Sequence, residues 1–290
     1  MVEVPGKLLV LQAMALCFVL YRQNQQATDC PPPYRSIERI VERVEVRNSV
    51  EATRNTGSRI EERNRLSKMI NEMMKGIKLQ YCETLKQRKS KKEKIDTTEE
   101  REYCSEDADA SARMFDKQLS KAMAHLMEGQ RAAGIGDRHG KFKRQMDVYT
   151  RVSSYDSYDG SPYIENITNN AVRFLDLTVP QYGLPLYDWL VCLEVAHHVP
   201  REFQDILVDN LARHARTGII LSWAPPGPDS VHHVNELMPE EVDKVMKKVG
   251  FSLDSYSTKL LTDAAMRPWA KKNVRVYERD PGVKADKDEA

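Results

Sequence analysis

The chain has 290 residues, of which 41% are apolar and 30% charged, and its formal net charge is +1 at pH 7. This length suits one large domain, or one ordinary domain with an extension, because single domains mostly span about 100–200 residues. The near-neutral charge excludes the basic field of typical nucleic-acid binders, so no nucleic-acid partner is expected. The five cysteines form no CxxC pair and have no zinc-ligand spacing, so no metal site is expected.

The N-terminal segment carries a hydrophobic run that bears on the compartment. Leu8–Tyr21 is apolar apart from Gln12 and lies between Lys7 and Arg22. At about 14 residues it is shorter than the roughly 20 residues of a membrane-spanning helix, but it suits the apolar part of a signal peptide. The sequence therefore predicts a signal peptide or short membrane anchor over residues 1–30, and a secretory or membrane-anchored location rather than a cytoplasmic one. A buried or amphipathic helix is the alternative.

Residues 31–111 form a second region, rich in charged side chains and poor in apolar ones. Its apolar residues keep helical spacing in two places, so helices are expected there. These positions are Ile37, Ile40, Val41 and Val44, then Leu66, Met69, Ile70, Met73 and Ile77. The helices suit either a coiled-coil or partner-binding stem, or an exposed and partly disordered extension, since the apolar stripe is thin.

From Gly134 onward, short apolar runs alternate with helical patterns, which is typical of βαβ units and a parallel sheet. The expected strands cover 151–158, 171–175, 189–193 and 218–223, followed by two β-like segments at 253–261 and 273–279, the last antiparallel. Helices are expected over 201–216 and 239–249, and another over 114–126 would cover the sheet. The fold class is therefore α/β, in a domain over residues 112–290.

Acidic residues follow the first two expected strands, at the edge where open α/β sheets bind ligands. Asp159 and Gly160 follow the first strand, and an acid there can accept hydrogen bonds from both ribose hydroxyls of a nucleoside. Asp176 and Leu177 follow the next strand, where they suit an adenine amino group and ring face. A turn-forming role is the alternative for both acids.

Four segments together resemble the class I S-adenosylmethionine-dependent methyltransferases. They are Tyr-Asp-Gly-Ser-Pro at 158–162, Phe-Leu-Asp-Leu at 174–177, the strand and turn at 187–200, and Gly-Ile-Ile-Leu-Ser-Trp at 218–223. The resemblance implies a Rossmann-like seven-stranded methyltransferase sheet, S-adenosylmethionine as the cofactor, and methyl transfer to an acceptor that the sequence does not identify. It also implies that Leu193 contacts the cofactor.

The first motif of this family is a strand ending in an acid, followed by a glycine-rich turn. The corresponding residues here are Gly134, Gly136 and Gly140, spaced G-x-G-x-x-x-G, with no acid two residues before Gly134. Residues 128–131 are a poor strand sequence. The sequence therefore predicts that the loop is remodelled, or that the first strand is degraded or missing, with an ordinary surface turn as the alternative.

No catalytic residue is assigned from the sequence. Glu194, His197 and His198 follow the third expected strand and are the candidates. A helix cap is the alternative role for Glu194, and a helix-entry pair for the two histidines. His232 and His233 follow a proline-rich loop, for which a flexible loop without a ligand is the favoured interpretation. A sulfonium is already an excellent leaving group, so positioning and desolvation should matter more than a dedicated acid or base.

Two other functions remain open from the sequence. A catalytically silent methyltransferase fold, used as a binding or interaction module, would account for the irregular loop and the charged N-terminal region. A nicotinamide-dependent oxidoreductase would also carry an acid after its second strand. The segment at 187–200 and the two late β-like segments argue against the oxidoreductase.

Overall fold

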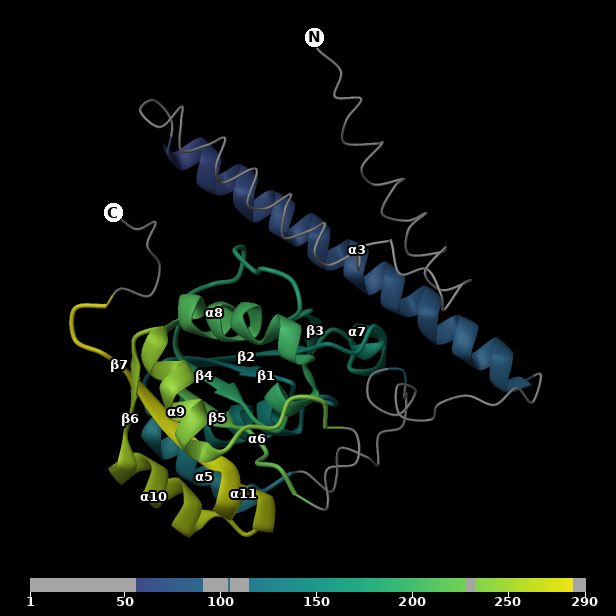
Figure 1. Ribbon diagram of the computed structural model, residues 1–290. Helices are drawn as coiled ribbons and strands as arrows, with labels where there is room; N and C mark the ends of the chain where they lie inside the picture. Colours follow the sequence, from purple (N-terminus) through teal and green to yellow (C-terminus); the bar gives the residue numbers. More distant parts are fainter. Residues whose placement is uncertain (1–55, 91–103, 105–114, 228–232, 284–290) are drawn as a thin grey trace. The chain divides into compact units, whose positions relative to one another are not determined.

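The computed structural model describes residues 56–90, 104, 115–227 and 233–283 (Figure 1). The predicted signal or anchor segment, Leu8–Tyr21, and the first predicted helix, around Ile37–Val44, lie outside the described residues. Arg63–Ala290 forms one compact unit, which we call the 63–290 unit. Its boundary lies well before residue 112, where the sequence predicted the start of the domain.

Among the described residues, seven strands form one sheet in the order β3-β2-β1-β4-β5-β7-β6. The strands are β1 (Arg131–Ile135), β2 (Ser154–Asp159), β3 (Arg173–Phe174), β4 (Tyr187–Cys192), β5 (Ala215–Ser222), β6 (Phe251–Leu253) and β7 (Val274–Arg279). The first five strands pair in parallel, while β7 is antiparallel to both β5 and β6. The predicted seven-stranded Rossmann-like sheet, with an antiparallel final strand, is confirmed.

The first strand is present, contrary to the prediction that it could be degraded or missing. β1 lies in the middle of the sheet, paired with β2 on one side and β4 on the other. Its residues Ala132, Ala133 and Gly134 are small and buried. Tyr155 and Trp189, which pair with Ala132 in the adjacent strands, fill the core layer on its face of the sheet, and the Tyr155 hydroxyl occupies the space beside Gly134. Small residues give a weak hydrophobic pattern, which is why the strand was not recognised in the sequence.

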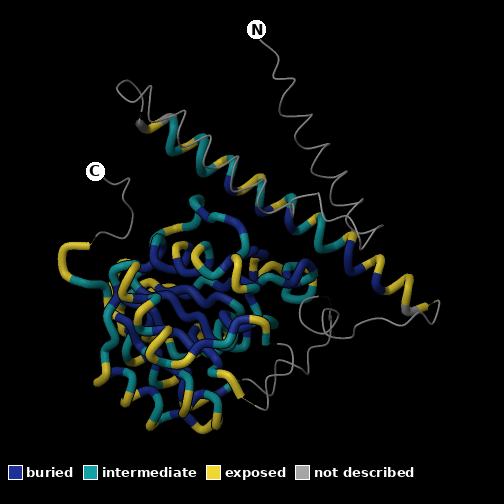
Figure 2. The backbone as a smooth tube through the Cα atoms, viewed as in Figure 1, coloured by how far each residue is buried: buried dark blue, intermediate teal, exposed yellow. Residues whose placement is uncertain are grey.

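Helices cover both faces of the sheet in the 63–290 unit (Figure 1). They are α5 (Lys117–Leu126), α6 (Lys141–Tyr149), α7 (Ile164–Ile167), α8 (Gln204–His214), α9 (Pro239–Lys248), α10 (Ser255–Ala264) and α11 (Pro268–Asn273). One core layer joins the sheet to α5, α6, α10 and α11, and includes Met123, Met146 and Leu261. Figure 2 shows that buried residues gather in the strands, while the outer faces of the helices are exposed. The helix predicted over 114–126 is confirmed as α5.

The segment predicted as β-like over 253–261 is mostly helix, which is a correction. β6 ends at Leu253, and α10 begins directly after Asp254. The Asp254 carboxylate accepts hydrogen bonds from the backbone N–H groups of Tyr256 and Ser257, as an N-cap residue does. This cap starts a helix in a segment whose apolar residues alone do not distinguish a helix from a strand.

The long helix α3 (Thr56–Ser90) is polar, and its part from Arg63 onward belongs to the 63–290 unit. Ser67 donates a hydrogen bond to the carbonyl of Pro180, and Asn71 donates one to the carbonyl of Phe174. Cys82 near the end of α3 forms a disulfide bond with Cys104. These contacts attach α3 to the α/β unit, and nothing in the described residues supports the predicted coiled coil.

No helix within the described ranges combines the length and apolarity that crossing a membrane requires. The predicted anchor segment is not among those ranges.

We expect Asp116→Ala to lower the free energy of unfolding by about 2–4 kcal/mol, because four backbone donors would lose a buried charged acceptor. Asp116 is 2% exposed. One carboxylate oxygen caps α5 at the N–H groups of Gln118 and Leu119, and the other accepts from Met266 and Arg267, just before α11. Urea denaturation of the full chain measures this loss.

The matched control is Asp254→Ala, which removes a cap from a single helix and should cost only about 1 kcal/mol. Equal losses in the two variants would show that the second pair of hydrogen bonds to Asp116 adds no stability.

Candidate functional site

The turn that follows β1 is hydrogen-bonded to the carboxyl end of β2. The backbone N–H groups of Gly136 and Asp137 donate to the carbonyl of Tyr158, at 2.7 and 3.3 Å. The N–H of Arg138 donates to the Asp159 carboxylate at 2.8 Å. The turn Gly136–Gly140 is therefore fixed at the carboxyl ends of β1 and β2, the position where open α/β sheets bind ligands.

Three residues of this turn have left-handed backbone conformations. The φ angles are +84° at Gly136, +44° at Arg138 and +69° at Gly140. Glycine adopts such angles without steric cost, and Arg138 adopts one while its N–H is bound to Asp159. The turn thus has an arginine at a position whose conformation glycine usually supplies.

Gly134 does not belong to this turn, which corrects the predicted loop. It lies inside β1, where a β carbon would collide with the hydroxyl of Tyr155. A β carbon at Gly136 would collide with the side chain of Val195. Side chains of the protein therefore occupy the space next to both glycines, so their first role is in packing.

Asp137 is a buried acid that no motif in the sequence marks. Its carboxylate accepts hydrogen bonds from the N–H groups of Phe142 and Lys143, at the start of α6, and from the hydroxyl of Ser157. Burial raises the pKa of Asp137 to about 6, against the lowering effect of these donors. The carboxyl group holds α6, the turn and β2 together.

Asp159, predicted to bind ribose, lies at the carboxyl end of β2 and is buried. One carboxylate oxygen accepts the N–H of Arg138, and the other accepts the N–H of Ser161, both at 2.8 Å. Each oxygen of an ionised carboxylate can accept about two hydrogen bonds, so both keep capacity for a ligand. Gly160 follows, and its carbonyl lies 3.4 Å from Lys78 Nζ of α3.

Asp176, predicted to bind an adenine amino group, is already engaged by other groups. It is 1% exposed, and its Oδ1 accepts hydrogen bonds from the N–H and hydroxyl of Thr178. Its Oδ2 forms an ion pair with Lys78 at 3.0 Å, which, despite burial, keeps the pKa of Asp176 below its usual value. Asp176 thus fastens α3 to the sheet, a role that could not be read without knowing where α3 packs. Leu177 beside it is also buried.

A cavity of about 230 Å³ lies between the turn Gly136–Gly140 and the carboxyl end of β4. It is lined by Phe115, Gly136, Asp137, Arg138, Lys141, Phe142, Leu193, Glu194, His197, His198, His233 and Trp269. All three catalytic candidates therefore line it, together with Gly136 and Leu193 of the predicted cofactor residues. Gly134, Gly140, Asp159, Gly160, Asp176 and Leu177 are not among the lining residues.

Glu194 occupies a sharp bend after β4, with a φ of +57°. Its N–H donates to the hydroxyl of Ser222 at the end of β5, and that hydroxyl donates back to the Glu194 carboxylate. Burial raises the pKa of Glu194, although its neighbours His198 and His233 act in the opposite direction. Cys192, just before the bend, is fully buried, and burial raises its thiol pKa to about 12. It packs as an inert residue.

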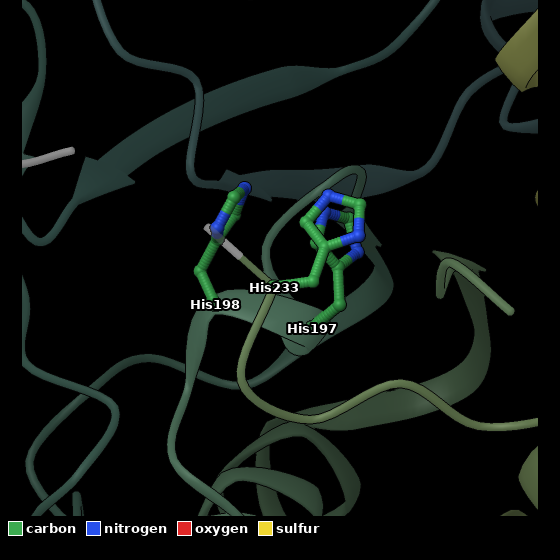
Figure 3. Close-up of side chains that lie close together, drawn as sticks. All are labelled: His197, His198 and His233. Atoms are coloured by element: carbon green, nitrogen blue, oxygen red, sulfur yellow. The ribbon is translucent and has the colours of Figure 1, made fainter. Parts of the chain in front are cut away.

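Three histidines lie close together beyond the carboxyl end of β4 (Figure 3). The ring centroid of His197 lies 4.3 Å from that of His198 and 4.1 Å from that of His233. Burial lowers the pKa of His197 to about 2, so this ring is neutral. A loop without a ligand was the favoured interpretation for His233, since only the fold brings residues 197 and 233 together. His232 lies outside the described residues.

His139 in the glycine turn has two ring nitrogens that are buried and find no hydrogen-bond partner among the described residues. Burial lowers the pKa of this ring, while the nearby charge of Asp159 raises it. Buried polar atoms are nearly always hydrogen-bonded, so these two nitrogens indicate a place for a polar ligand or water. No sequence pattern singled this residue out.

Comparisons with known proteins give a likeness of fold. No family model and no curated protein sequence matches the chain. Magnesium protoporphyrin IX methyltransferase from Synechocystis, solved with bound SAH, is 15% identical, with a TM-score of 0.40, and the match covers 64% of this chain and 89% of that chain. The CcbJ methyltransferase from Streptomyces caelestis is 9% identical, with a TM-score of 0.43 over 59% of this chain and 92% of that chain.

The buried carboxyl of Asp137 should make stability depend on pH. Its pKa is about 6 in the folded chain, above the ordinary value of 3.8, so the folded state holds the proton more tightly than the unfolded state. The stabilising contribution of the protonated form is therefore lost as pH rises from about 4 to about 6, at a cost of about 2–3 kcal/mol. Chemical denaturation at a series of pH values measures it.

The comparison variant is Asp137→Asn, which cannot titrate. The difference in unfolding free energy between the native chain and this variant should shift by about 2 kcal/mol across that pH range, in favour of the variant at higher pH. The exposed residue Asp147, replaced by Asn, should leave the pH dependence unchanged. Parallel curves for the native chain and Asp137→Asn would contradict the raised pKa.

Proposed function

We propose that the 63–290 unit is an S-adenosylmethionine-dependent methyltransferase. The observation that carries the proposal is the cavity between the turn Gly136–Gly140 and the segment Leu193–His198, at the carboxyl ends of β1 and β4. Ligands of open α/β sheets bind at this edge, where the strand order reverses. The antiparallel β7 between β5 and β6 favours a methyltransferase over a plain dinucleotide-binding fold.

The turn Gly136–Gly140 and the adjoining end of β2 offer three features that suit the cofactor, of which the first lies in the cavity lining and the other two beside it. Gly136 and Arg138 of the turn line the cavity, so the methionine portion can lie against them while their N–H groups stay bonded to β2. The Asp159 carboxylate keeps acceptor capacity for ribose hydroxyls. The orphaned ring nitrogens of His139 offer polar atoms beside that acid. When bound, the cofactor supplies an electrophilic methyl group on a sulfonium that leaves readily.

The nucleoside side of the site differs from the predicted arrangement. Asp176 is paired with Lys78 and Thr178, so we assign it to holding α3 rather than to an adenine amino group. Lys78 also reaches the carbonyl of Gly160. Residues of α3 therefore border the place where adenine would lie, and we infer that α3 is part of the cofactor site.

The protein's contribution to methyl transfer would be positioning and exclusion of water. Leu193, Phe142 and Trp269 give the cavity apolar walls, and Glu194, His198 and His233 give it polar atoms on the β4 side. Such a surface can orient an acceptor nucleophile toward the methyl group and strip its water. The acceptor itself is not identified by these residues.

Calorimetric titration of S-adenosylmethionine into the full chain tests the proposal. We expect binding in the native chain, and a loss of about 1.5–3 kcal/mol in Asp159→Ala, because the ribose hydroxyls would lose a charged acceptor. His139→Ala should also weaken binding if its ring nitrogens bond the ligand. The exposed Asp147→Ala is the matched control and should bind as the native chain does.

Circular dichroism of each variant separates lost binding from lost structure. Absence of binding in the folded native chain would support the silent-module alternative. Unchanged affinity in a folded Asp159→Ala variant would remove that residue from the site.

We propose further that the chain enters the secretory pathway. Two independent features support this: the apolar segment Leu8–Tyr21, and the disulfide between Cys82 and Cys104. Disulfides persist in oxidising compartments and are rare in the cytosol. Removal of the segment and its retention as a short anchor are both compatible with this proposal.

A fluorescent reporter fused after residues 1–35 tests the compartment. We expect a secretory-pathway pattern, and its loss when a charged residue replaces Ala15 in the middle of the apolar run, because a charge disrupts such a segment. A Gln12→Ser fusion controls for substitution as such. Diffuse cytosolic fluorescence of the unaltered fusion would reject the proposal.

A further inference from the structure

The three histidines beyond the carboxyl end of β4 form a compact cluster of side chains of a kind that can bind a metal ion. His197, His198 and His233 each offer a ring nitrogen, and these three atoms lie within 4.8 Å of one another. The rings come from two segments, the turn after β4 and the loop after β5, and Figure 3 shows them side by side. All three line the cavity.

Glu236 orients the ring of His233. Nδ1 of His233 lies 2.8 Å from the Glu236 carboxylate, and both side chains are largely shielded from solvent. A carboxylate at Nδ1 fixes the proton on that nitrogen and leaves the lone pair on Nε2. Histidine ligands of metals commonly have this arrangement, with a carboxylate that sets the tautomer and the direction of the ring.

Backbone hydrogen bonds fix the two segments to each other. The N–H groups of Val234 and Asn235 both donate to the carbonyl of His197, at 2.9 and 3.1 Å. The indole N–H of Trp223 donates to the carbonyl of Asn235. The backbone at His197 and directly after His233 is therefore held before any ligand binds, which lowers the entropic cost of binding one.

We propose that His198 and His233, completed by His197, bind a divalent transition-metal ion, with Zn²⁺ as the best match. Imidazole nitrogens suit zinc, and three protein ligands with one open position are typical of catalytic zinc sites. The open position would face the cavity. This departs from the expectation of no metal, which rested on sequence spacing and could not anticipate ligands from separate segments.

His197 has to adjust in order to serve as the third ligand. Its Nδ1 accepts a hydrogen bond from the N–H of Ala224 at 3.2 Å, which places the ring proton on Nε2. This contact is long for its kind, and coordination would replace it. His198 and His233 therefore carry most of the affinity, and the contribution of His197 is smaller.

The metal would give the cavity a binding point for the methyl acceptor. A zinc ion with an open position binds hydroxyl, thiol or imidazole groups and lowers their pKa, which makes them better nucleophiles. The acceptor would then be a molecule with such a group beside an apolar portion that Trp269 and Phe142 can contact. This assignment rests on the proposed function, whereas metal binding itself does not.

Zinc titration of the untagged full chain, first stripped with EDTA, tests the site. We expect stoichiometric binding by calorimetry, and a tetrahedral absorption spectrum when Co²⁺ is the probe. His198→Ala and His233→Ala should each weaken Zn²⁺ binding by more than about tenfold, and Glu236→Gln by about tenfold. His197→Gln should cost less than either alanine variant.

The matched control is His125→Ala, which removes an exposed histidine of α5 and should leave Zn²⁺ affinity unchanged. Circular dichroism checks that each variant folds, and Glu236→Gln gives a milder test that leaves all three ligands in place. No Zn²⁺ binding by the native chain, or equal affinity in folded His198→Ala and His233→Ala variants, would overturn the site.

Titrating S-adenosylmethionine into the same samples separates this inference from the proposed function. Zinc binding without cofactor binding would leave the metal site standing and remove the methyltransferase. Cofactor binding without zinc binding would do the reverse.

Discussion

The parallel pairing of β1 with β2 is the constraint on which the site depends. It brings the carbonyl of Tyr158 and the carboxylate of Asp159 under the turn Gly136–Gly140, where they accept three successive backbone N–H groups. Those hydrogen bonds offset the unfavourable free energy of the left-handed backbone at Arg138. The cavity beside β4 has its shape because this turn cannot move away from the sheet.

The mostly parallel sheet and most of its strands were predictable from the sequence, but the central strand β1 was not. Strands β4 and β5 carry large apolar residues and stand out, whereas Ala132 of β1 is small beside Trp189 and Tyr155, which fill the same core layer. The information that identifies β1 lies in its neighbours. The segment Leu253–Leu261 was predicted to be β-like because its apolar residues fit a strand as well as a helix. The helix there begins at Asp254, whose side chain caps it by hydrogen bonds.

The candidate site was predictable only where its residues follow strands. Asp159, Glu194, His197 and His198 could be found in this way, because the carboxyl end of a parallel strand is a fixed place in the fold. His233 and Lys78 could not, since each reaches the site from a segment whose path is set by tertiary contacts. The polar face of α3 resembles a solvated helix in sequence, yet Lys78 pairs with a fully buried acid.

The bond between Cys82 of α3 and Cys104 spans a sequence separation of 22 residues. A protease that cut the chain between these two cysteines would therefore release nothing. The helix that carries Lys78 would stay covalently attached to the rest of the unit, and only reduction of the disulfide would separate the two fragments. In a protease-rich environment, Lys78 would keep its place beside the buried Asp176 after the backbone had been cut.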